Sequence, residues 1–283
     1  MSKRPPSAHE RPSTISQALE KAILAVRTQR PAEAERLASR VLKSNRDHLL
    51  AAQILGEALL LQDRSEEAVD VLQRAARRGS DPAAETLLGM ALAAVGRSEE
   101  ALDQLRLATT RRPPFLLAFL QLGDRLGDIG GFGEGIAVLE SGLALMPGAE
   151  VLRLALGYLH LKRNDRAEAR ALFSQVLAAG LGRPNALVGL ARVMALDGEY
   201  EEAADLYRRV LATRPDDAVT RIALAKCLLE MGDRQAGEAA LRAAARGDAG
   251  LARRAISALA ATPHGRFFLR PSAAAKFLGV ETK

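Results

Sequence analysis

The sequence predicts an all-α protein, an α-solenoid in which antiparallel helix pairs stack one after another. Three observations support this prediction. The chain of 283 residues is 48% hydrophobic but only 4% aromatic, and its apolar residues are mainly Ala, Leu and Val, a composition that favours helices. A short sequence pattern recurs with a nearly constant spacing, which is typical of repeat proteins. Residues that tolerate a left-handed backbone recur with the same spacing, where helices would end.

The recurring pattern is a small residue, usually preceded by an acidic one, with a large apolar residue four positions later in most periods. A second column, Leu followed by Gly or Ala, lies upstream of it and runs from Leu55-Gly56 to Leu224-Ala225. The intervals between the small residues are 34, 33, 34, 34, 34 and 34 positions. These residues are Ala34, Ala68, Ala101, Gly135, Ala169, Ala203 and Gly237. Seven recurrences predict seven structural repeats, each one helix pair.

This pattern resembles the tetratricopeptide repeat, a family in which each 34-residue repeat forms a helix–turn–helix. The resemblance covers residues 15–248 and assigns Leu-Gly or Leu-Ala to positions 7 and 8, the small residue to position 20 and the large apolar residue to position 24. The chain departs from the family at position 11, where residues such as Leu59 and His160 replace an aromatic one. The resemblance implies a right-handed superhelix with the first helix of each repeat on its concave side. The repeats begin at Ile15, Leu49, Pro82, Leu116, Glu150, Pro184 and Ala218.

Local signals predict where the two helices of each repeat begin and end. Position 15 is Gly96 in the third repeat and Asn164 in the fifth, and both residue types tolerate the left-handed conformation that ends a helix. Pairs of Glu, such as Glu66-Glu67, fall in the predicted first turn of the second helix, and Arg pairs, such as Arg111-Arg112 and Arg208-Arg209, fall near its end. Both placements complement the helix dipole, so much of the net charge of +6 has a structural explanation.

Segments outside the repeats complete the predicted organisation. Residues 1–14 are rich in Pro and in basic residues, and we expect a disordered tail. Residues 249–262 have one apolar and one basic face, which predicts the capping helix that a terminal repeat requires. Residues 263–283 do not repeat, and Ser272 and Gly279 predict a short helix over residues 273–278.

The non-repeat segment contains three of the seven phenylalanines, Phe267, Phe268 and Phe277, and has two interpretations. As a lid, it folds back and covers apolar surface at the end of the array. As a docking segment, it presents these side chains to another molecule or to a second copy of the chain.

No pattern of residues predicts catalysis, a metal site or a cofactor site. The four histidines are dispersed, and none belongs to a metal-binding motif. Cys227 is the only cysteine, so an intramolecular disulfide is excluded, and we expect a packed, unreactive thiol. The Gly-rich stretch 127–135 lacks the Lys of a phosphate-binding loop and falls at the turn of the fourth repeat. We therefore expect a protein that is not an enzyme and binds no cofactor.

In tetratricopeptide repeat proteins, positions 5 and 9 of the first helices line a peptide-binding groove, and here they are polar or charged at several places. The groove is predicted to be acidic toward the N-terminus and basic toward Arg192 and Lys226, which would orient a partner segment with its acidic end there. The alternative is a solvated face with scattered charges. Position 5 is Gln53, Thr86, Leu120, Leu154, Val188 and Ile222, and position 9 is Glu57, Met90, Asp124, Tyr158, Arg192 and Lys226.

These features predict a scaffold that binds a partner peptide or protein segment. Two alternatives remain open: an accessory subunit of a separately encoded enzyme, and a polyanion or nucleic-acid binder that uses the Arg-rich helix ends. The scarcity of aromatic residues for base stacking disfavours nucleic acid. Self-association is compatible with the sequence. No signal-like segment or long apolar stretch stands out, so we expect a cytoplasmic protein, and the abundance of Arg and Ala suggests a bacterial source.

Overall fold

The computed structural model describes residues 14–180, 184–246, 248–266 and 271–279, and every regular element in these ranges is a helix. Internal contacts divide the chain into two compact bodies, which we call the N-terminal body, residues 1–152, and the C-terminal body, residues 153–283. The all-α fold class is therefore as predicted. The boundary falls inside the first helix of the fifth repeat, and each body is described by itself below.

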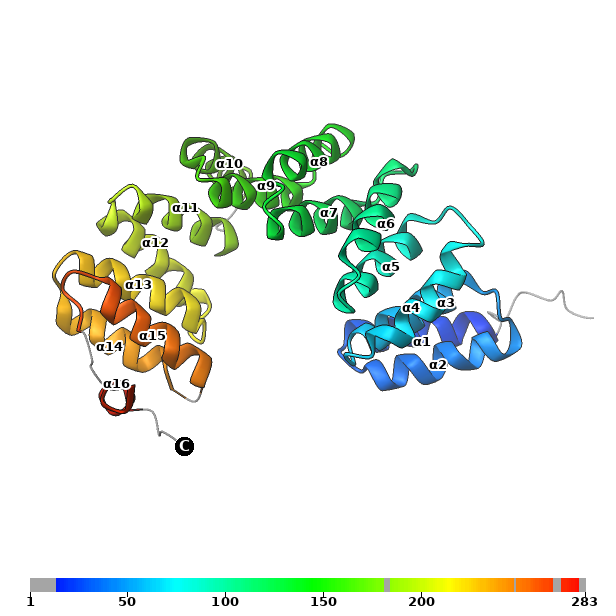
Figure 1. Cartoon of the computed structure of the whole chain (residues 1–283), viewed down its shortest axis with the longest axis horizontal. Coiled ribbons are helices and arrows are strands. Elements are labelled where there is room, and N and C mark those ends of the chain that lie inside the picture. The colour runs from blue at the N-terminus through cyan, green and yellow to red at the C-terminus, as the bar shows by residue number, and fades with distance from the viewer. Residues whose placement is uncertain (1–13, 181–183, 247, 267–270, 280–283) are drawn as a thin grey trace, which may run out of the picture. The chain divides into compact units, whose positions relative to one another are not determined.

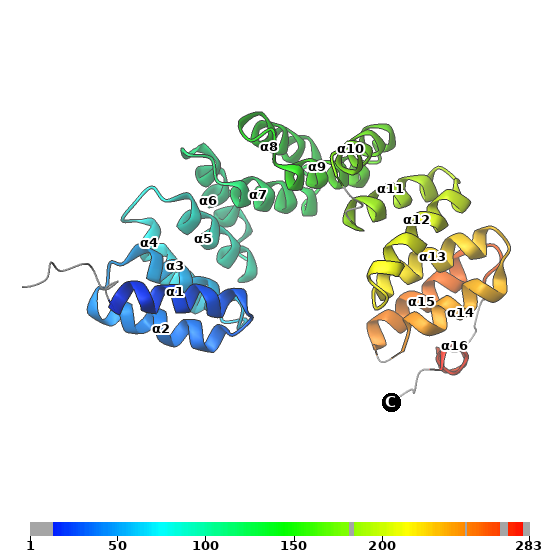
Figure 2. The same cartoon turned by 180° about the vertical axis from the view of Figure 1, so that it is seen from behind.

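From α1 to α14, helices with odd numbers are the first helices of the repeats and helices with even numbers are the second ones, whereas α15 and α16 follow the last repeat (Figures 1 and 2). The first eight are α1 (Thr14–Arg27), α2 (Pro31–Ser44), α3 (Leu49–Leu60), α4 (Ser65–Ala76), α5 (Pro82–Ala94), α6 (Ser98–Thr110), α7 (Leu116–Asp128) and α8 (Phe132–Leu145). The other eight are α9 (Glu150–Arg163), α10 (Arg166–Ala178), α11 (Pro184–Leu196), α12 (Tyr200–Thr213), α13 (Ala218–Glu230), α14 (Arg234–Ala244), α15 (Ala249–Ala261) and α16 (Pro271–Leu278). The first helices begin at the residues expected from the sequence, except that α1 begins one residue earlier, at Thr14.

The turn between the two helices has the same geometry in all seven repeats. The residue at position 15 has a positive φ in each, and the next residue donates its N–H to the carbonyl of position 11 at 2.8–3.0 Å, which is the hydrogen bond of a Schellman cap. In the first repeat Gln29 takes this conformation, with φ of 56°. The first helix pair is thus formed like the others. The seven residues are Gln29, Asp63, Gly96, Gly130, Asn164, Gly198 and Gly232.

The two helices of a repeat approach so closely that position 8 has no room for a side chain in several repeats. A Cβ atom built on Gly56 would lie 2.5 Å from Leu72 at position 24, and one on Gly123 would lie 2.8 Å from Leu139. Both leucines are fully buried. Small residues at position 8 therefore bring the first helix against the second.

Phe173 replaces the leucine of position 24 in the fifth repeat, and two glycines accommodate its larger ring. A Cβ on Gly157 would lie 2.8 Å from the ring, and one on Gly189, in the first helix of the next repeat, would lie 2.5 Å from it. Phe173 has no exposed surface. The ring thus joins three helices, α9, α10 and α11.

The first helices lie on the inner side of each body. Neighbouring first helices contact one another, α1 with α3, α3 with α5 and α5 with α7 in the N-terminal body, and α11 with α13 in the C-terminal body. In the described part of the chain, the second helices α2, α4 and α6 have no contacts of similar extent with one another. The first helices in contact therefore share a surface within each body, on the side away from the second helices.

One expectation about helix ends is wrong. Arg208 and Arg209 do not lie at the end of a helix, because α12 continues to Thr213. Arg208 instead forms an ion pair with Asp205 at 2.7 Å, three residues earlier on the same helix. Pairing with a carboxylate, and not the helix dipole, therefore accounts for this charge.

The Phe173 contact predicts the effect of adding one methyl group. Gly189→Ala should lower the free energy of unfolding by about 1–3 kcal/mol, because the buried ring has to move. As a matched control, Gly133→Ala in α8 meets no atom within 4 Å and should raise it by about 0.4–1 kcal/mol. Urea denaturation followed by circular dichroism measures both changes. Equal shifts of the two midpoints would contradict the close approach at Gly189.

Candidate functional site

The twelve residues of the predicted groove lie on six first helices, three in each body. Those of the N-terminal body are on α3, α5 and α7, and those of the C-terminal body are on α9, α11 and α13. The sides of these helices that point away from the second helices are called the N-terminal inner face and the C-terminal inner face. Each carries half of the predicted residues.

The N-terminal inner face is polar and acidic. Glu57 in the second repeat and Asp124 in the fourth repeat are exposed. Met90 in the third repeat and Leu120 in the fourth are half-buried. Gln53 donates a hydrogen bond from Nε2 to Oδ1 of Asp81, at 2.6 Å. Desolvation by the surrounding protein raises the pKa of Glu57 above its usual value, and no ion pair of this carboxylate is found among the described residues.

The C-terminal inner face carries two basic residues at the same repeat position on neighbouring helices. Arg192 on α11 and Lys226 on α13 are exposed, and neither forms an ion pair within the described part of the chain. Leu154 and Val188 are half-buried and add apolar surface. This face can therefore offer both positive charge and apolar contact.

Tyr158 lies on the same face, and its position is fixed by two contacts. Its hydroxyl donates a hydrogen bond to the carbonyl oxygen of Asn185 at 2.6 Å, and its ring meets the Phe173 ring edge-on, with centroids 5.0 Å apart. Burial raises the pKa of Tyr158, and the nearby positive charge of Arg192 lowers it by less. The phenol therefore stays protonated and remains a hydrogen-bond donor at neutral pH.

Two of the twelve predicted groove residues are not available to a partner. Thr86 has no exposed surface, and its hydroxyl donates a hydrogen bond to the Pro82 carbonyl oxygen at 2.6 Å. Ile222 is 8% exposed and packs in the core formed with α14 and α15. At these two places position 5 points into packed helices. Position 9 is exposed or half-buried in all six repeats.

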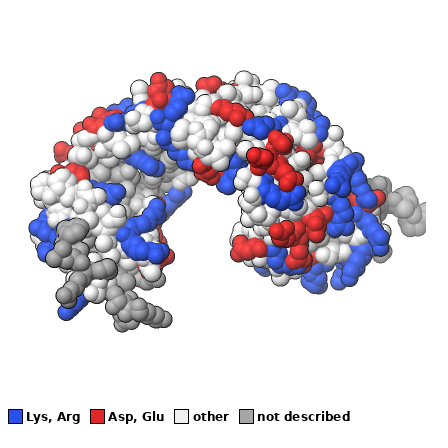
Figure 3. Space-filling view, viewed as in Figure 1, with Lys and Arg blue, Asp and Glu red and all other residues white. Residues whose placement is uncertain are grey.

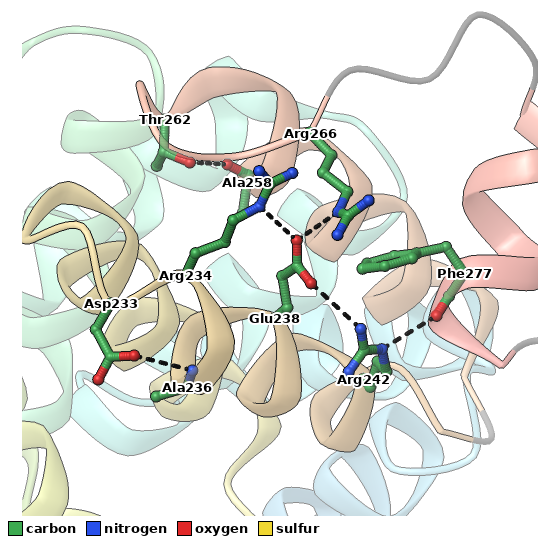
Figure 4. Close-up of polar contacts among 9 residues, drawn as sticks. All are labelled: Asp233, Arg234, Ala236, Glu238, Arg242, Ala258, Thr262, Arg266 and Phe277. Atoms are coloured by element: carbon green, nitrogen blue, oxygen red, sulfur yellow. Dashed lines mark hydrogen bonds and ion pairs between the residues drawn. The ribbon is translucent and has the colours of Figure 1, made fainter.

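The C-terminal segment is held by a carboxylate that three arginines share (Figure 4). Glu238 on α14 is 5% exposed. It accepts hydrogen bonds from Nε of Arg234 at 2.9 Å, from Nε of Arg266 at 2.5 Å and from Arg242 at 3.3 Å. Burial by itself would raise the pKa of Glu238, but the hydrogen bonds from Arg266 and Arg234 outweigh it and lower the pKa.

The helix α16 packs against the last repeat through Phe277. The guanidinium groups of Arg242 and Arg266 lie 4.5 and 4.9 Å from the centre of its ring, and Arg242 also donates to its carbonyl oxygen at 3.3 Å (Figure 4). Leu278 is 2% exposed in the core that α13, α14 and α15 share. Both contacts are those expected of a lid.

Two further observations concern this segment. Nδ1 of His264 lies 3.0 Å from the carbonyl oxygen of Leu229, at the end of α13. Phe267 and Phe268 lie outside the described residues. The docking interpretation of these two phenylalanines therefore stays a prediction.

Two titratable residues inside the array, Cys227 and His160, are buried among other parts of the chain. Burial raises the pKa of the Cys227 thiol to about 11, so the reactive thiolate is scarce at neutral pH. His160 is buried, and its Nδ1 lies 3.1 Å from a carboxylate oxygen of Asp165 in the following turn. No group of three or more His, Cys, Asp or Glu that could hold a metal ion is found among the described residues. Within the same ranges, every helix is too short or too polar to cross a membrane.

The Glu238 cluster predicts a pH-dependent contribution to stability. At pH 7, Glu238→Gln should lower the free energy of unfolding by about 1–3 kcal/mol, because it removes the charge that three arginines share. The pKa of Glu238 is lowered from 4.5 in the folded protein, so its contribution is present above that value and is lost as the pH falls through the folded pKa. The difference between wild type and variant should therefore shrink in acid.

Urea denaturation of the two proteins at pH 7 and pH 3 measures this change. Glu202→Gln, at an exposed position in the first turn of α12, is the matched control. A penalty of equal size at both pH values would show that the charge of Glu238 contributes nothing.

Comparisons with known proteins identify the repeats. Three family models described as tetratricopeptide repeat match the chain: one matches residues 19–84 and 154–218, another residues 194–261, and a third residues 82–106. No curated protein sequence matches the chain.

Solved structures resemble the fold at low sequence identity. A tetratricopeptide repeat protein from Parabacteroides merdae is 14% identical, with a TM-score of 0.66, over 85% of this chain and 98% of that one. PilW, a type IV pilus biogenesis factor, is 17% identical, with a TM-score of 0.63, over 72% of this chain and 94% of its own. A chain of the APC/C hetero-tetramer Cut9-Hcn1 is 15% identical, with a TM-score of 0.68, over 88% of this chain and 50% of that one.

The family models, the seven repeated turns and the helix pairs agree with one another. The chain belongs to the tetratricopeptide repeat family, whose repeats are generally protein-interaction modules.

Proposed function

We propose that this protein is a non-catalytic scaffold whose C-terminal inner face binds an acidic segment of a partner protein. The observation that carries the proposal is the pair Arg192 and Lys226. Both side chains are exposed, they occupy the same position on contacting helices, and neither has an acidic partner among the described residues. Two unneutralised charges on one concave face attract a complementary partner.

The surroundings of the two charges suit a polypeptide. Leu154 and Val188 leave part of their apolar surface open, and Tyr158 presents an aromatic ring held by the Asn185 carbonyl. A protein segment gains from apolar contact as well as from charge, whereas a simple ion gains only from charge. Membership in the family supports the same reading, and one similar structure is a chain of a hetero-tetramer.

The N-terminal inner face has the opposite character. Glu57 and Asp124 are exposed there, with Met90 half-buried. Asp124 forms an ion pair with Arg125 at 3.2 Å, so Glu57 is the carboxylate of the two that favours a basic segment. An accessory subunit of a separately encoded enzyme would use the same faces, with the enzyme as the partner. That reading is a special case of the scaffold proposal.

Binding of nucleic acid through the Arg-rich helix ends is less well supported. Many of these arginines are neutralised by carboxylates of the chain, as Arg64 is by Glu35 and Glu67 and Arg111 is by Glu85. Pairing of this kind leaves fewer free charges for phosphates. Tight binding of a nonspecific RNA that weakens steeply with salt would favour this alternative.

The proposal predicts the effect of removing the two inner-face charges. Arg192→Ala with Lys226→Ala should lower recovery of the partner by about tenfold or more, because charge pairs at the rim and centre of an interface are lost. Affinity purification with mass spectrometry, using tagged wild type and the double variant, measures the difference.

A second double variant serves as the control. Arg209→Ala with Arg253→Ala removes the same charge from exposed positions elsewhere in the C-terminal body and should leave recovery unchanged. If the two double variants recover the same proteins in the same amounts, the C-terminal inner face is not the binding site.

A further inference from the structure

A cleft of about 670 Å³ opens in the N-terminal body, between the ends of α2 and α4 and the start of α3. It is separate from the N-terminal inner face, because the ends of the second helices form much of its wall. Its floor is apolar and comprises Leu42, Leu49, Ala52, Leu55, Val71 and Ala75.

The cleft lies where position 4 of the second repeat is small. In the fourth repeat that position holds Phe119, which is 2% exposed and whose ring would lie 2.9 Å from a Cβ on Gly142, at position 27. The second repeat has Ala52 and Ala75 at these two positions. An aromatic side chain that fills the fourth repeat is therefore missing from the second.

The third repeat fills position 4 in another way. Its residue is Glu85, whose side chain is 2% exposed and accepts a hydrogen bond from Nη2 of Arg111 at 2.6 Å. Both following repeats thus occupy this position with groups of their own chain. In the second repeat Ala52 and Ala75 are buried at the bottom of the cleft, 8% and 7% exposed, and the space above them can take an aromatic side chain of another molecule.

The rim of the cleft is basic. Lys43, Arg46, Arg74 and Arg78 line it, and Asp47, the one carboxylate among the lining residues, is paired with Arg78. Lys43 and Arg46 are exposed and form no ion pair in the described part of the chain. Figure 3 shows Lys and Arg gathered along the edge of the N-terminal body where α2 and α4 end.

We propose that this cleft is a docking site for an acidic peptide segment that inserts one aromatic side chain. The ring lies over Ala52 and Ala75, and flanking Asp or Glu residues meet Lys43 and Arg46. The apolar floor supports a peptide over a nucleic acid, because its side chains are aliphatic and provide no aromatic platform for stacking a base. The site lies on another body than Arg192 and Lys226, so it does not depend on the function proposed above.

Fluorescence anisotropy with a labelled heptapeptide of three Glu, one Phe and three Glu tests the proposal on the full chain. Ala52→Phe should weaken binding by about tenfold or more, because the added ring occupies the cleft. Lys43→Glu with Arg46→Glu should weaken it similarly by charge repulsion. These two positions are exposed, so the double variant provides the test if Ala52→Phe does not fold, as judged by circular dichroism.

Two controls separate this site from the C-terminal inner face and from simple charge attraction. The Phe peptide should bind the Arg192→Ala, Lys226→Ala variant as tightly as wild type, whatever that variant does to the function proposed above. A peptide with Ala in place of Phe should bind about tenfold more weakly or worse.

Three results would overturn the proposal. The first is no detectable binding of the Phe peptide to wild type. The second is equal affinity of the Phe and Ala peptides, which would indicate charge attraction alone. The third is displacement of the peptide by a single-stranded uridine dodecamer whose own binding is lost in Ala52→Phe. That result would make the occupant of the cleft a nucleic acid.

Discussion

The close approach of the two helices within each repeat is the constraint on which the rest of the fold depends. At position 8 a glycine leaves space that Leu72, Leu139 or the Phe173 ring fills from the second helix. The turn that joins the helices has to reverse the chain within two to four residues, and a left-handed residue at position 15 does this in every repeat. Given these two features, the first helices converge on one side and the second helices spread on the other.

The period made most of this architecture predictable, because packing and turn repeat together. The period could not predict the places where an unusual residue type occupies a repeated position or where residues far apart in the sequence make a contact. Gln29 takes a left-handed turn conformation that its residue type rarely adopts, and the next residue, Arg30, still closes the turn by donating its N–H to the Ala25 carbonyl. The carboxylate of Glu238 binds Arg234, four residues before it, and also Arg266, 28 residues after it and beyond α15. The second separation is beyond the range of any local pattern.

The candidate sites were only partly predictable for a related reason. Position 9 faces outward wherever the first helices converge, so the helical period alone identifies Arg192 and Lys226 as exposed. Position 5 lies nearer the contact between neighbouring first helices, and its exposure depends on how closely each pair packs. Thr86 and Ile222 are buried there, whereas Val188 is not. The sequence of one repeat does not contain this information, because the neighbouring repeat supplies the covering atoms.

Positions that the repeat leaves free are where this chain differs from one repeat to the next, and position 4 shows how such differences arise. The frame tolerates Phe119, the ion-paired Glu85 and the small Ala52, because the close contact at positions 8 and 24 holds the helices together in each case. A helix pair that is held together by positions 8 and 24 can have a small residue at position 4, and hence a cleft, at little cost in stability. The same reasoning applies to charge: arginines such as Arg64 and Arg97 are paired with Glu three residues later, so the basic residues without a carboxylate stand out. In a repeat protein, candidate binding surfaces are therefore found where the residue at a repeated position is packed or paired differently from the residues at the same position in neighbouring repeats.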